Sequence, residues 1–513
     1  MPYTNRQAKY QKYIIIILSA IPVILHLYTN LFAGYGIFRD ELYYIACTDR
    51  LDFGYVDQPP FSIALMYISN MLIGNSVFAI RLLPAVFSGL TVFIVCMMTL
   101  ELGGRNYSFL LSSMAVIFAP IYLAMGTFYS MNFLDIFIWA LSFYIILLIL
   151  KNSRQYLWII LGVVMGIGLL NKTGFLWFIA GFTAGLLITD KRKEFLTLKP
   201  YVTYLISITI FLPYVLWNFQ NDFAHLEFIR NAVNEKYSSI GIIDFLIGQL
   251  LNLNPIAALI WIPGLYFFLS NRENSGYRIP AIIFLTTALI LIINGHSKAE
   301  YLAASYTVLL AGGAVFIEKR TLVRLRWIRY TMLGILLVTG IALLPFALPV
   351  LPVKTFISYS NAIGITPQNS EGHELTELPQ FYSDMHGWEK LAEDVSNVYQ
   401  SLPRDDRLNT LIFGRNYGEA AAMEYFKNKY PIPRTISPHN SYWLWGYGGN
   451  EDPILIIIGG DSTDHLRIFE NVEQAMIHEA EYSMPYENNI PIYIARNAKM
   501  PLSEVWNEIK TYQ

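Results

Sequence analysis

The sequence has few charged residues and almost no cysteine. Only 14% of its 513 residues are charged, whereas 54% are hydrophobic, a composition typical of a chain that folds in lipid. Its two cysteines, Cys47 and Cys96, lie in a polar segment and in an apolar run, so we expect neither a disulfide framework nor a thiolate metal site. The 36 basic residues are balanced by 38 acidic ones, which leaves no basic footprint for nucleic acid.

Three further signals are missing. The N-terminal apolar run over 14–33 follows Arg6, Lys9 and Lys12 but has no small-residue cleavage site, so it is expected to remain as a first membrane span. The sequence has no convincing glycine-rich cradle for a nucleotide. It also has no internal repeat of fixed period.

Long apolar runs recur up to about Pro352, and each is long enough to cross roughly 30 Å of hydrocarbon. Together they predict about eleven transmembrane helices. The runs cover residues 14–33, 78–100, 108–125, 131–150, 156–170, 174–189, 201–217, 251–269, 279–294, 301–317 and 328–350.

Basic residues are concentrated in alternate loops between these runs. With the N-terminus in the cytoplasm, this distribution satisfies the positive-inside rule at every turn. The loops that are poor in basic residues then face the outer side and can converge on one site. They are 38–61, 125–132, 171–172, 218–250 and 294–298.

The composition becomes polar after Pro352. We therefore predict two domains. The first is an all-α transmembrane domain over 1–352, with interfacial helices in the first outer loop and in the 218–250 loop. The second is an extracytoplasmic α/β domain over 353–513. In that second domain the patterns predict strands at 410–413, 454–458 and 492–495, and helices at 388–400, 418–427 and 466–479.

Segment 38–61 is the most charged stretch of the N-terminal region and reads FRDELYYIACTDRLDFGYVDQPPF. A cluster of charges at a membrane surface marks a functional site by default. Asp40 and Glu41 could merely keep a loop solvated, but a solvating loop does not need the aromatic residues, Asp57 and the proline pair that follow. Pro59 and Pro60 introduce an apolar-rich stretch that predicts a short amphipathic helix along the interface.

This segment resembles the first outer loop of the family 39 type membrane glycosyltransferases, relatives of protein O-mannosyltransferases and of the aminoarabinose transferases that act on lipid A. The resemblance continues through LAMGTFYSMNFLD (123–135), GLLNKTGFLW (168–177), KAEYLAASYTVLLAGGA (298–314) and NYGEAAAMEYF (416–426). It implies the multi-span C-type glycosyltransferase fold. It also implies transfer of a sugar from a polyprenyl-phosphate carrier to a lipid, glycan or protein acceptor, with a periplasmic active site on a Gram-negative inner membrane.

The resemblance assigns roles to the acidic residues. In the resembling enzymes the first acidic residue of the pair takes a proton from the acceptor, which makes Asp40 the expected base. Glu41 would orient Asp40 or hold the sugar. Direct attack on the anomeric carbon would invert its configuration. Asp57, with Tyr43 and Tyr55, is expected to bind the acceptor or to support the site.

A lipid-phosphate donor needs a few cations near the interface. Lys172, Arg230 and Lys298 are the outer-side cations best placed to stabilise the leaving phosphate. Tyr301 corresponds to the tyrosine of the resembling KxxY pattern and could hydrogen-bond the phosphate. The two lysines also fit a second interpretation, in which they only extend from span ends to the interface. Relatives acting on lipid A have a basic residue where this chain has Gln58, which gives the lysines more weight.

Metal binding and two other functions stay open. His225 and His296 could bind a divalent ion with Asp57, although a histidine with other partners is commoner. A secondary transporter would suit the number of spans, but transporters tend to have internal repeats and ionisable residues near the midplane. A non-catalytic glycosyltransferase-like subunit is the other alternative, and the presence of Asp40 and Glu41 argues against it.

Two tryptophans in the tail, Trp443 and Trp445, allow two interpretations. They could form a loop that faces a sugar or an acceptor, or a buried aromatic cluster of the C-terminal domain.

Overall fold

The computed structural model describes residues 5–152, 154–236, 239–271, 275–321, 325–365 and 376–513. The chain forms two compact units. The first comprises Met1–Gly34, Phe78–Leu216 and Ser239–Pro352, and the second comprises Tyr35–Val77, Trp217–Ser238 and Val353–Gln513. The second unit therefore combines the C-terminal region with two segments that the sequence analysis assigned to the transmembrane domain.

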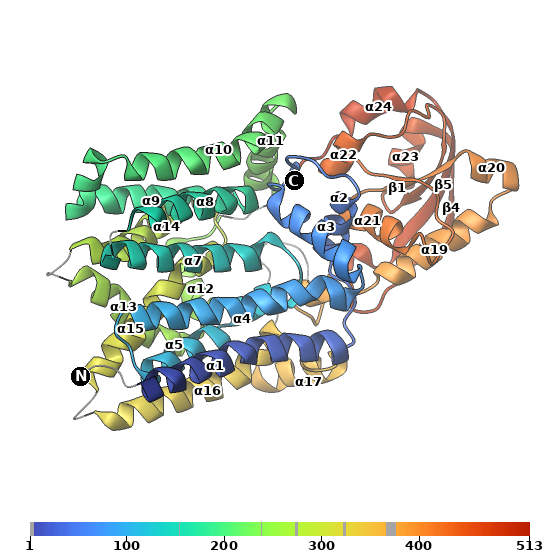
Figure 1. The fold of residues 1–513 in the computed structure, drawn as a ribbon. Helices are drawn as coiled ribbons and strands as arrows, with labels where there is room; N and C mark the ends of the chain where they lie inside the picture. The colour runs from blue at the N-terminus through green and yellow to red at the C-terminus, as the bar shows by residue number, and fades with distance from the viewer. Residues whose placement is uncertain (1–4, 153, 237–238, 272–274, 322–324, 366–375) are drawn as a thin grey trace. The chain divides into compact units, whose positions relative to one another are not determined.

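The first unit is built of α-helices, with 3-10 segments between some of them (Figure 1). In chain order these helices are α1 (Asn5–Phe32), α4 (Val77–Glu101), α5 (Asn106–Ile117), α6 (Pro120–Thr127), α7 (Met131–Asn152), α8 (Gln155–Asn171), α9 (Phe175–Ile188), α10 (Lys199–Gln220), α12 (Ile242–Asn252), α13 (Ala258–Leu269), α14 (Ile279–Asn294), α15 (Tyr306–Arg320) and α16 (Arg326–Ala347).

Each predicted apolar run coincides with a helix or a broken helix. Among the described residues, seven helices are long and apolar enough to span a membrane, and nine spans result if each bent pair counts as one. The pairs are α5 with α6, bent by 59°, and α12 with Pro255–Leu269, bent by 98°. Pro120 and Pro255 stand directly after the breaks, where their missing N–H groups interrupt the helical hydrogen bonding.

The predicted total of about eleven spans is higher because it includes α8 and α9. These two helices are apolar but have only 17 and 14 residues, fewer than the roughly 20 that cross a bilayer without distortion. The helical membrane domain itself is confirmed.

Two glycines allow α13 and α15 to pack with their backbones in contact. A Cβ atom at Gly264 would lie 1.9 Å from the carbonyl oxygen of Leu309, and one at Gly313 would lie 1.8 Å from that of Ile260. Small residues at such crossings let membrane helices approach closely, which is a main source of their association in lipid.

We predict that Gly313→Ala destabilises the protein by about 1–3 kcal/mol, because the added methyl group forces the two backbones apart. Thermal unfolding of the purified protein in detergent measures the change. Gly334→Ala on α16 is the matched control, since nothing lies within 4 Å of a Cβ there, and it should be neutral or slightly stabilising. Equal destabilisation by both variants would contradict this packing argument.

The second unit contains a five-stranded mixed sheet of order β2-β1-β3-β5-β4 (Figure 1). Its strands are β1 (Thr410–Gly414), β2 (Thr435–Ile436), β3 (Ile454–Ile458), β4 (Phe469–His478) and β5 (Ile490–Ala498). Strand β1 is parallel to β2 and β3, whereas β5 is antiparallel to β3 and β4. On one face, the register pairs Leu455 with Ala495 and Ile457 with Tyr493, and these residues form a core with Trp506.

The helices of this unit come from three parts of the chain. Those from the first outer loop and the 217–238 segment are α2 (Arg39–Thr48), α3 (Phe61–Ile73) and α11 (Ala224–Asn231). Those of the C-terminal region are α17 (Val353–Ile363), α18 (Gln380–Ser383), α19 (Trp388–Ser401), α20 (Arg404–Leu408), α21 (Tyr417–Phe426), α22 (Ser441–Trp445), α23 (Ser462–Ile468) and α24 (Leu502–Glu508).

The α/β prediction for the C-terminal region is confirmed, with one element wrong. Strands at 410–413, 454–458 and 492–495 and helices at 388–400 and 418–427 are present. The helix predicted at 466–479 is instead the end of α23 followed by β4, which pairs with β5 from Phe469 to His478. Its glutamates and glutamine favour a helix locally, but an edge strand tolerates them, and pairing with a neighbouring strand overrides local propensity.

Candidate active site

Helix α2 carries the acidic pair of the first outer loop. Both acidic residues lie in its first turn, where negative charge is favoured by the helix dipole. Glu41 is fully buried, and its Oε2 accepts a hydrogen bond of 2.9 Å from the N–H of Phe38. Asp40 stays partly exposed. The two carboxylates therefore differ: Glu41 caps the start of the helix, and Asp40 is partly exposed to solvent.

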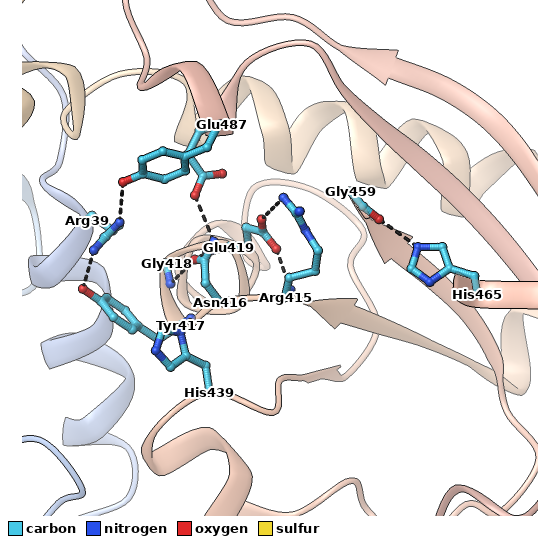
Figure 2. Close-up of polar contacts among 11 residues, drawn as sticks. Arg39, Arg415, Asn416, Tyr417, Gly418, Glu419, His439, Gly459, His465 and Glu487 are labelled. Atoms are coloured by element: carbon cyan, nitrogen blue, oxygen red, sulfur yellow. Dashed lines mark hydrogen bonds and ion pairs between the residues drawn. The ribbon is translucent and has the colours of Figure 1, made fainter. Parts of the chain in front are cut away.

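Asp40 is held by a tyrosine from the C-terminal region. The Tyr417 hydroxyl donates to Asp40 Oδ1 at 2.8 Å. The Arg39 guanidinium donates to the same hydroxyl at 2.9 Å and to the Tyr486 hydroxyl at 2.7 Å. Figure 2 shows Arg39 reaching toward Tyr417 at the first turn of α21. Tyr417 lies in the segment 416–426 that shares the family resemblance, but its sequence pattern indicated no role for it.

Asp57 is held by a tyrosine of α2. The Tyr43 hydroxyl donates to Asp57 Oδ1 at 2.9 Å and accepts a hydrogen bond of 3.3 Å from the N–H of Ser441. Tyr43 is buried, and burial raises the pKa of this phenol well above its usual value, so it keeps its proton. The Tyr55 hydroxyl lies 3.3 Å from backbone atoms of Cys47 and Arg50, so it serves to hold the loop.

The other end of α2 is tied to the C-terminal region by Arg50. Its guanidinium forms two hydrogen bonds with the Glu424 carboxylate, at 2.6 and 3.0 Å, and lies 4.4 Å from the ring centre of Trp445. Trp443, in contrast, packs against the sheet core and donates to the carbonyl oxygen of Trp506 at 2.9 Å. Of the two tryptophans, only Trp445 lies beside α2.

The cations expected to bind phosphate are divided between the units. In the first unit, Lys172 Nζ donates to Asn132 Oδ1 at 2.8 Å, lies 3.9 Å from Asp135 Oδ2 and sits 4.9 Å from the ring centre of Tyr301. Tyr301 and Lys298 lie one turn apart, because the N–H of Tyr301 donates to the carbonyl oxygen of Lys298 at 3.1 Å. The structure thus brings the side chains of Lys172 and Tyr301 together.

Asn132 and Asp135 were not predicted from the sequence as partners of Lys172. Asn132 lies in the first turn of α7 and Asp135 in the next turn, and Lys172 directly follows α8. The signal was available, since two consecutive antiparallel spans place the start of one and the end of the next on the same side.

Two further predicted residues, Arg230 and His225, lie on α11. Arg230 is exposed in the last turn of α11. His225 is buried, its Nδ1 lies 3.0 Å from the carbonyl oxygen of Val56, and burial lowers the pKa of its imidazole. Within the described ranges, no three His, Cys, Asp or Glu side chains are grouped as metal ligands.

The predicted residues therefore fall into two groups. The second unit contains Asp40, Glu41, Tyr43, Tyr55, Asp57, His225 and Arg230, and the first unit contains Lys172, His296, Lys298 and Tyr301.

Two buried carboxylates lie beside Tyr417 (Figure 2). Asn416 caps α21 by accepting from the N–H groups of Gly418 and Glu419, and its amide donates to Glu487 Oε1 at 2.9 Å. Glu419 accepts from the backbone and side chain of Arg415. Burial, followed by repulsion from Glu419, raises the pKa of Glu487 to about 8. Glu487 is therefore mostly protonated at neutral pH.

This shift predicts a pH dependence of stability. A proton bound by folded Glu487 is released by the unfolded chain near the usual pKa of about 4.3. The stabilisation of the folded protein by this proton is therefore complete below the pKa of the unfolded chain. It is lost as the pH rises through about 8, the pKa of folded Glu487. Arg39, Arg415 and Glu419 are the charged groups that act on it.

We expect Glu487→Gln to flatten the fall of melting temperature between about pH 5 and pH 9, because glutamine keeps the neutral form at every pH. Thermal unfolding across that range is the measurement. Glu470→Gln removes an exposed carboxylate of β4 and should keep the wild-type slope. A wild-type slope in Glu487→Gln would show that this carboxyl group is not protonated in the folded state.

Comparison with known proteins shows one family match and several structures of the same fold. Residues 57–217 match the family model described as dolichyl-phosphate-mannose-protein mannosyltransferase. No curated protein sequence matches the chain. The structure is similar to that of ArnT from Cupriavidus metallidurans bound to undecaprenyl phosphate, with a TM-score of 0.60 and 11% identity over 94% of this chain and 97% of that one.

Two archaeal structures are also similar. The apo oligosaccharyltransferase from Archaeoglobus fulgidus has a TM-score of 0.52 and 12% identity over 83% of this chain and 64% of its own. The oligosaccharyltransferase AglB from that organism, in complex with an inhibitory peptide and a dolichol-phosphate, has a TM-score of 0.51 and 12% identity over 85% and 70%. The comparisons confirm the predicted fold and the resemblance from which it was predicted.

Proposed function

We propose that this integral membrane protein is a glycosyltransferase that moves a sugar from a polyprenyl-phosphate donor to a lipid, glycan or protein acceptor. The observation that carries the proposal is Asp40, a partly exposed carboxylate held by Tyr417 at the start of a helix. The fold supports it, because ArnT bound to undecaprenyl phosphate and AglB with a dolichol-phosphate have the same fold.

In the proposed reaction, Asp40 takes the proton from the acceptor hydroxyl as its oxygen attacks the anomeric carbon. The bond from that carbon to the phosphate oxygen breaks, and polyprenyl phosphate leaves with the bonding electrons. One displacement inverts the configuration and needs no covalent intermediate on the enzyme. A base of this kind contributes typically 10²–10⁴-fold to the rate. If the acceptor is already an anion, Asp40 positions it and takes no proton.

The cations of the first unit have the complementary task. We propose that Lys172, Lys298 and Tyr301 bind the leaving phosphate, with Arg230 as a further cation for the donor. Asn132 orients the Lys172 ammonium group through its hydrogen bond of 2.8 Å, so that its remaining protons can reach phosphate oxygens. Asp57 with Tyr43 is assigned to the acceptor.

The distribution of basic residues supports an orientation for the chain. We propose that the N-terminus is cytoplasmic, that the protein resides in the inner or plasma membrane, and that the catalytic loops and C-terminal domain are extracytoplasmic.

We predict that Asp40→Asn lowers turnover by about 10²–10⁴-fold, because the amide cannot accept the proton. Purified wild type and variant are supplied with a panel of polyprenyl-phosphate sugars and acceptors, and free polyprenyl phosphate is measured. Asp49→Asn, which alters an exposed carboxylate just after the same helix, should turn over like wild type.

The outcomes separate the alternatives. Equal release by wild type and Asp40→Asn would remove Asp40 from the mechanism. Release by neither protein across a broad donor panel would favour a transporter or a non-catalytic subunit.

For donor binding, we expect Lys172→Gln to raise the KM for the lipid-phosphate donor by about 10- to 100-fold, since a hydrogen bond to a charged group is lost. Lys151→Gln is the control, because Lys151 pairs with Glu101 at 2.7 Å and is predicted to face the cytoplasm. Steady-state kinetics with varied donor give both values. An unchanged donor KM in Lys172→Gln would leave this lysine with only an anchoring role at the end of its helix.

A further inference from the structure

Tyr417 is a residue of the C-terminal region that contacts the proposed base directly. Its hydroxyl donates to Asp40 at 2.8 Å and accepts from Arg39 at 2.9 Å. Arg39 and Asp40 are adjacent on α2, and both therefore form a hydrogen bond with the hydroxyl group of Tyr417 on α21. The proposed reaction uses Asp40 but requires no group from the C-terminal region, so it leaves this contact without a role.

The tyrosine ring is held firmly within its own unit. Tyr417 is 7% exposed, and its ring centre lies 4.8 Å from that of Tyr43 and 5.0 Å from that of His439. The cap that Asn416 places on α21 determines where this helix begins, and Tyr417 is its first residue. The hydroxyl therefore cannot shift without moving the helix start or the rings on either side.

A second chain of hydrogen bonds starts at the backbone of Tyr417 and runs through His439. Its N–H donates to His439 Nδ1 at 3.3 Å, so the ring proton is on Nε2. That nitrogen lies 2.8 Å from the carbonyl oxygen of Gln513 and donates to it. Gln513 thus contributes to the position of Tyr417.

The direction of the hydrogen bond to Asp40 follows from its partners. Burial raises the pKa of the Tyr417 phenol well above its usual value, so the hydroxyl keeps its single proton. The Arg39 guanidinium has only donors. The hydroxyl must therefore accept from Arg39 and donate to Asp40 Oδ1. The hydrogen bond from Tyr417 occupies Oδ1 of Asp40 and leaves Oδ2 for the acceptor hydroxyl.

We infer that Tyr417 is a positioning residue for Asp40, and that the C-terminal domain through it sets the geometry of the transfer reaction. The inference rests on the proposed role of Asp40 as the base. It assigns to the C-terminal domain a part in turnover that is separate from any choice of acceptor. Arg39 and Arg50 secure the two ends of α2, while Tyr417 orients the carboxylate itself.

The test compares two tyrosines of the same helix. Tyr417→Phe removes the hydroxyl that holds Asp40, and Tyr425→Phe removes one that donates to the carbonyl oxygen of Asn75 at 3.1 Å. We expect Tyr417→Phe to lower kcat by about 10- to 100-fold, the loss typical of a misplaced catalytic group, with the donor KM unchanged. Tyr425→Phe should keep both parameters at wild-type values.

A double variant distinguishes positioning from general damage to the fold. If Tyr417 acts only through Asp40, adding Tyr417→Phe to Asp40→Asn should cause no further loss of the residual turnover. A loss that multiplies with that of Asp40→Asn would overturn the inference, because it would come from misfolding or from another part of the site. Melting temperatures of all variants are measured alongside.

The two proposals fail in different ways. Undiminished turnover in Asp40→Asn would remove the proposed base. A strong loss in Asp40→Asn together with wild-type kcat in Tyr417→Phe would leave the proposed function standing and overturn only the positioning role. A fall in kcat for Tyr417→Phe alone, with an unchanged donor KM, supports the inference.

Discussion

The hydrogen bond from Tyr417 to Asp40 joins two residues that are 377 positions apart in the chain. It couples the helix that follows the first membrane span to the first turn of a helix in the C-terminal sheet domain. Because Arg39 donates to the same hydroxyl, the bond has a defined direction. The presentation of the proposed base depends on this contact, which is supported in turn by the tautomer of His439 and the position of the final residue, Gln513.

Burial decides what each carboxylate near this contact can do. Glu41 is fully buried and is used to close the start of α2. Glu487 is also buried, and its raised pKa keeps it neutral beside Arg39 and Glu419. Asp40 alone of these three is partly exposed.

The residues proposed to bind phosphate lie in a different part of the molecule. Lys172, Asn132 and Tyr301 come from three segments of the first unit, where the ends of membrane spans bring them together. Elsewhere in this unit, close backbone packing at Gly264 and Gly313 contributes to the association of the helices. The polar residues can be concentrated at the span ends, where water is available.

The sequence by itself determined the elements whose signal is local. Long apolar runs predicted the membrane helices, because apolar side chains are removed from water wherever they occur. Short apolar runs predicted β1, β3 and the middle of β5. The acidic pair was also visible, because a charge cluster between two apolar spans stands out in composition. Within that cluster, the family resemblance pointed to Asp40, and it pointed to Tyr301 in the same way, whereas Lys172 was proposed as a cation at the outer end of a span.

Only the tertiary structure decided the partners of these residues. It buried Glu41 as a helix cap and left Asp40 partly exposed, and it paired residues 469–478 as a strand. It also placed Tyr417 beside Asp40 and Asn132 beside Lys172. The physical reason is that strand pairing and side-chain hydrogen bonds depend on which segments the topology makes adjacent. A periodic pattern reports the burial of a residue and carries no information about which distant residue will lie opposite to it.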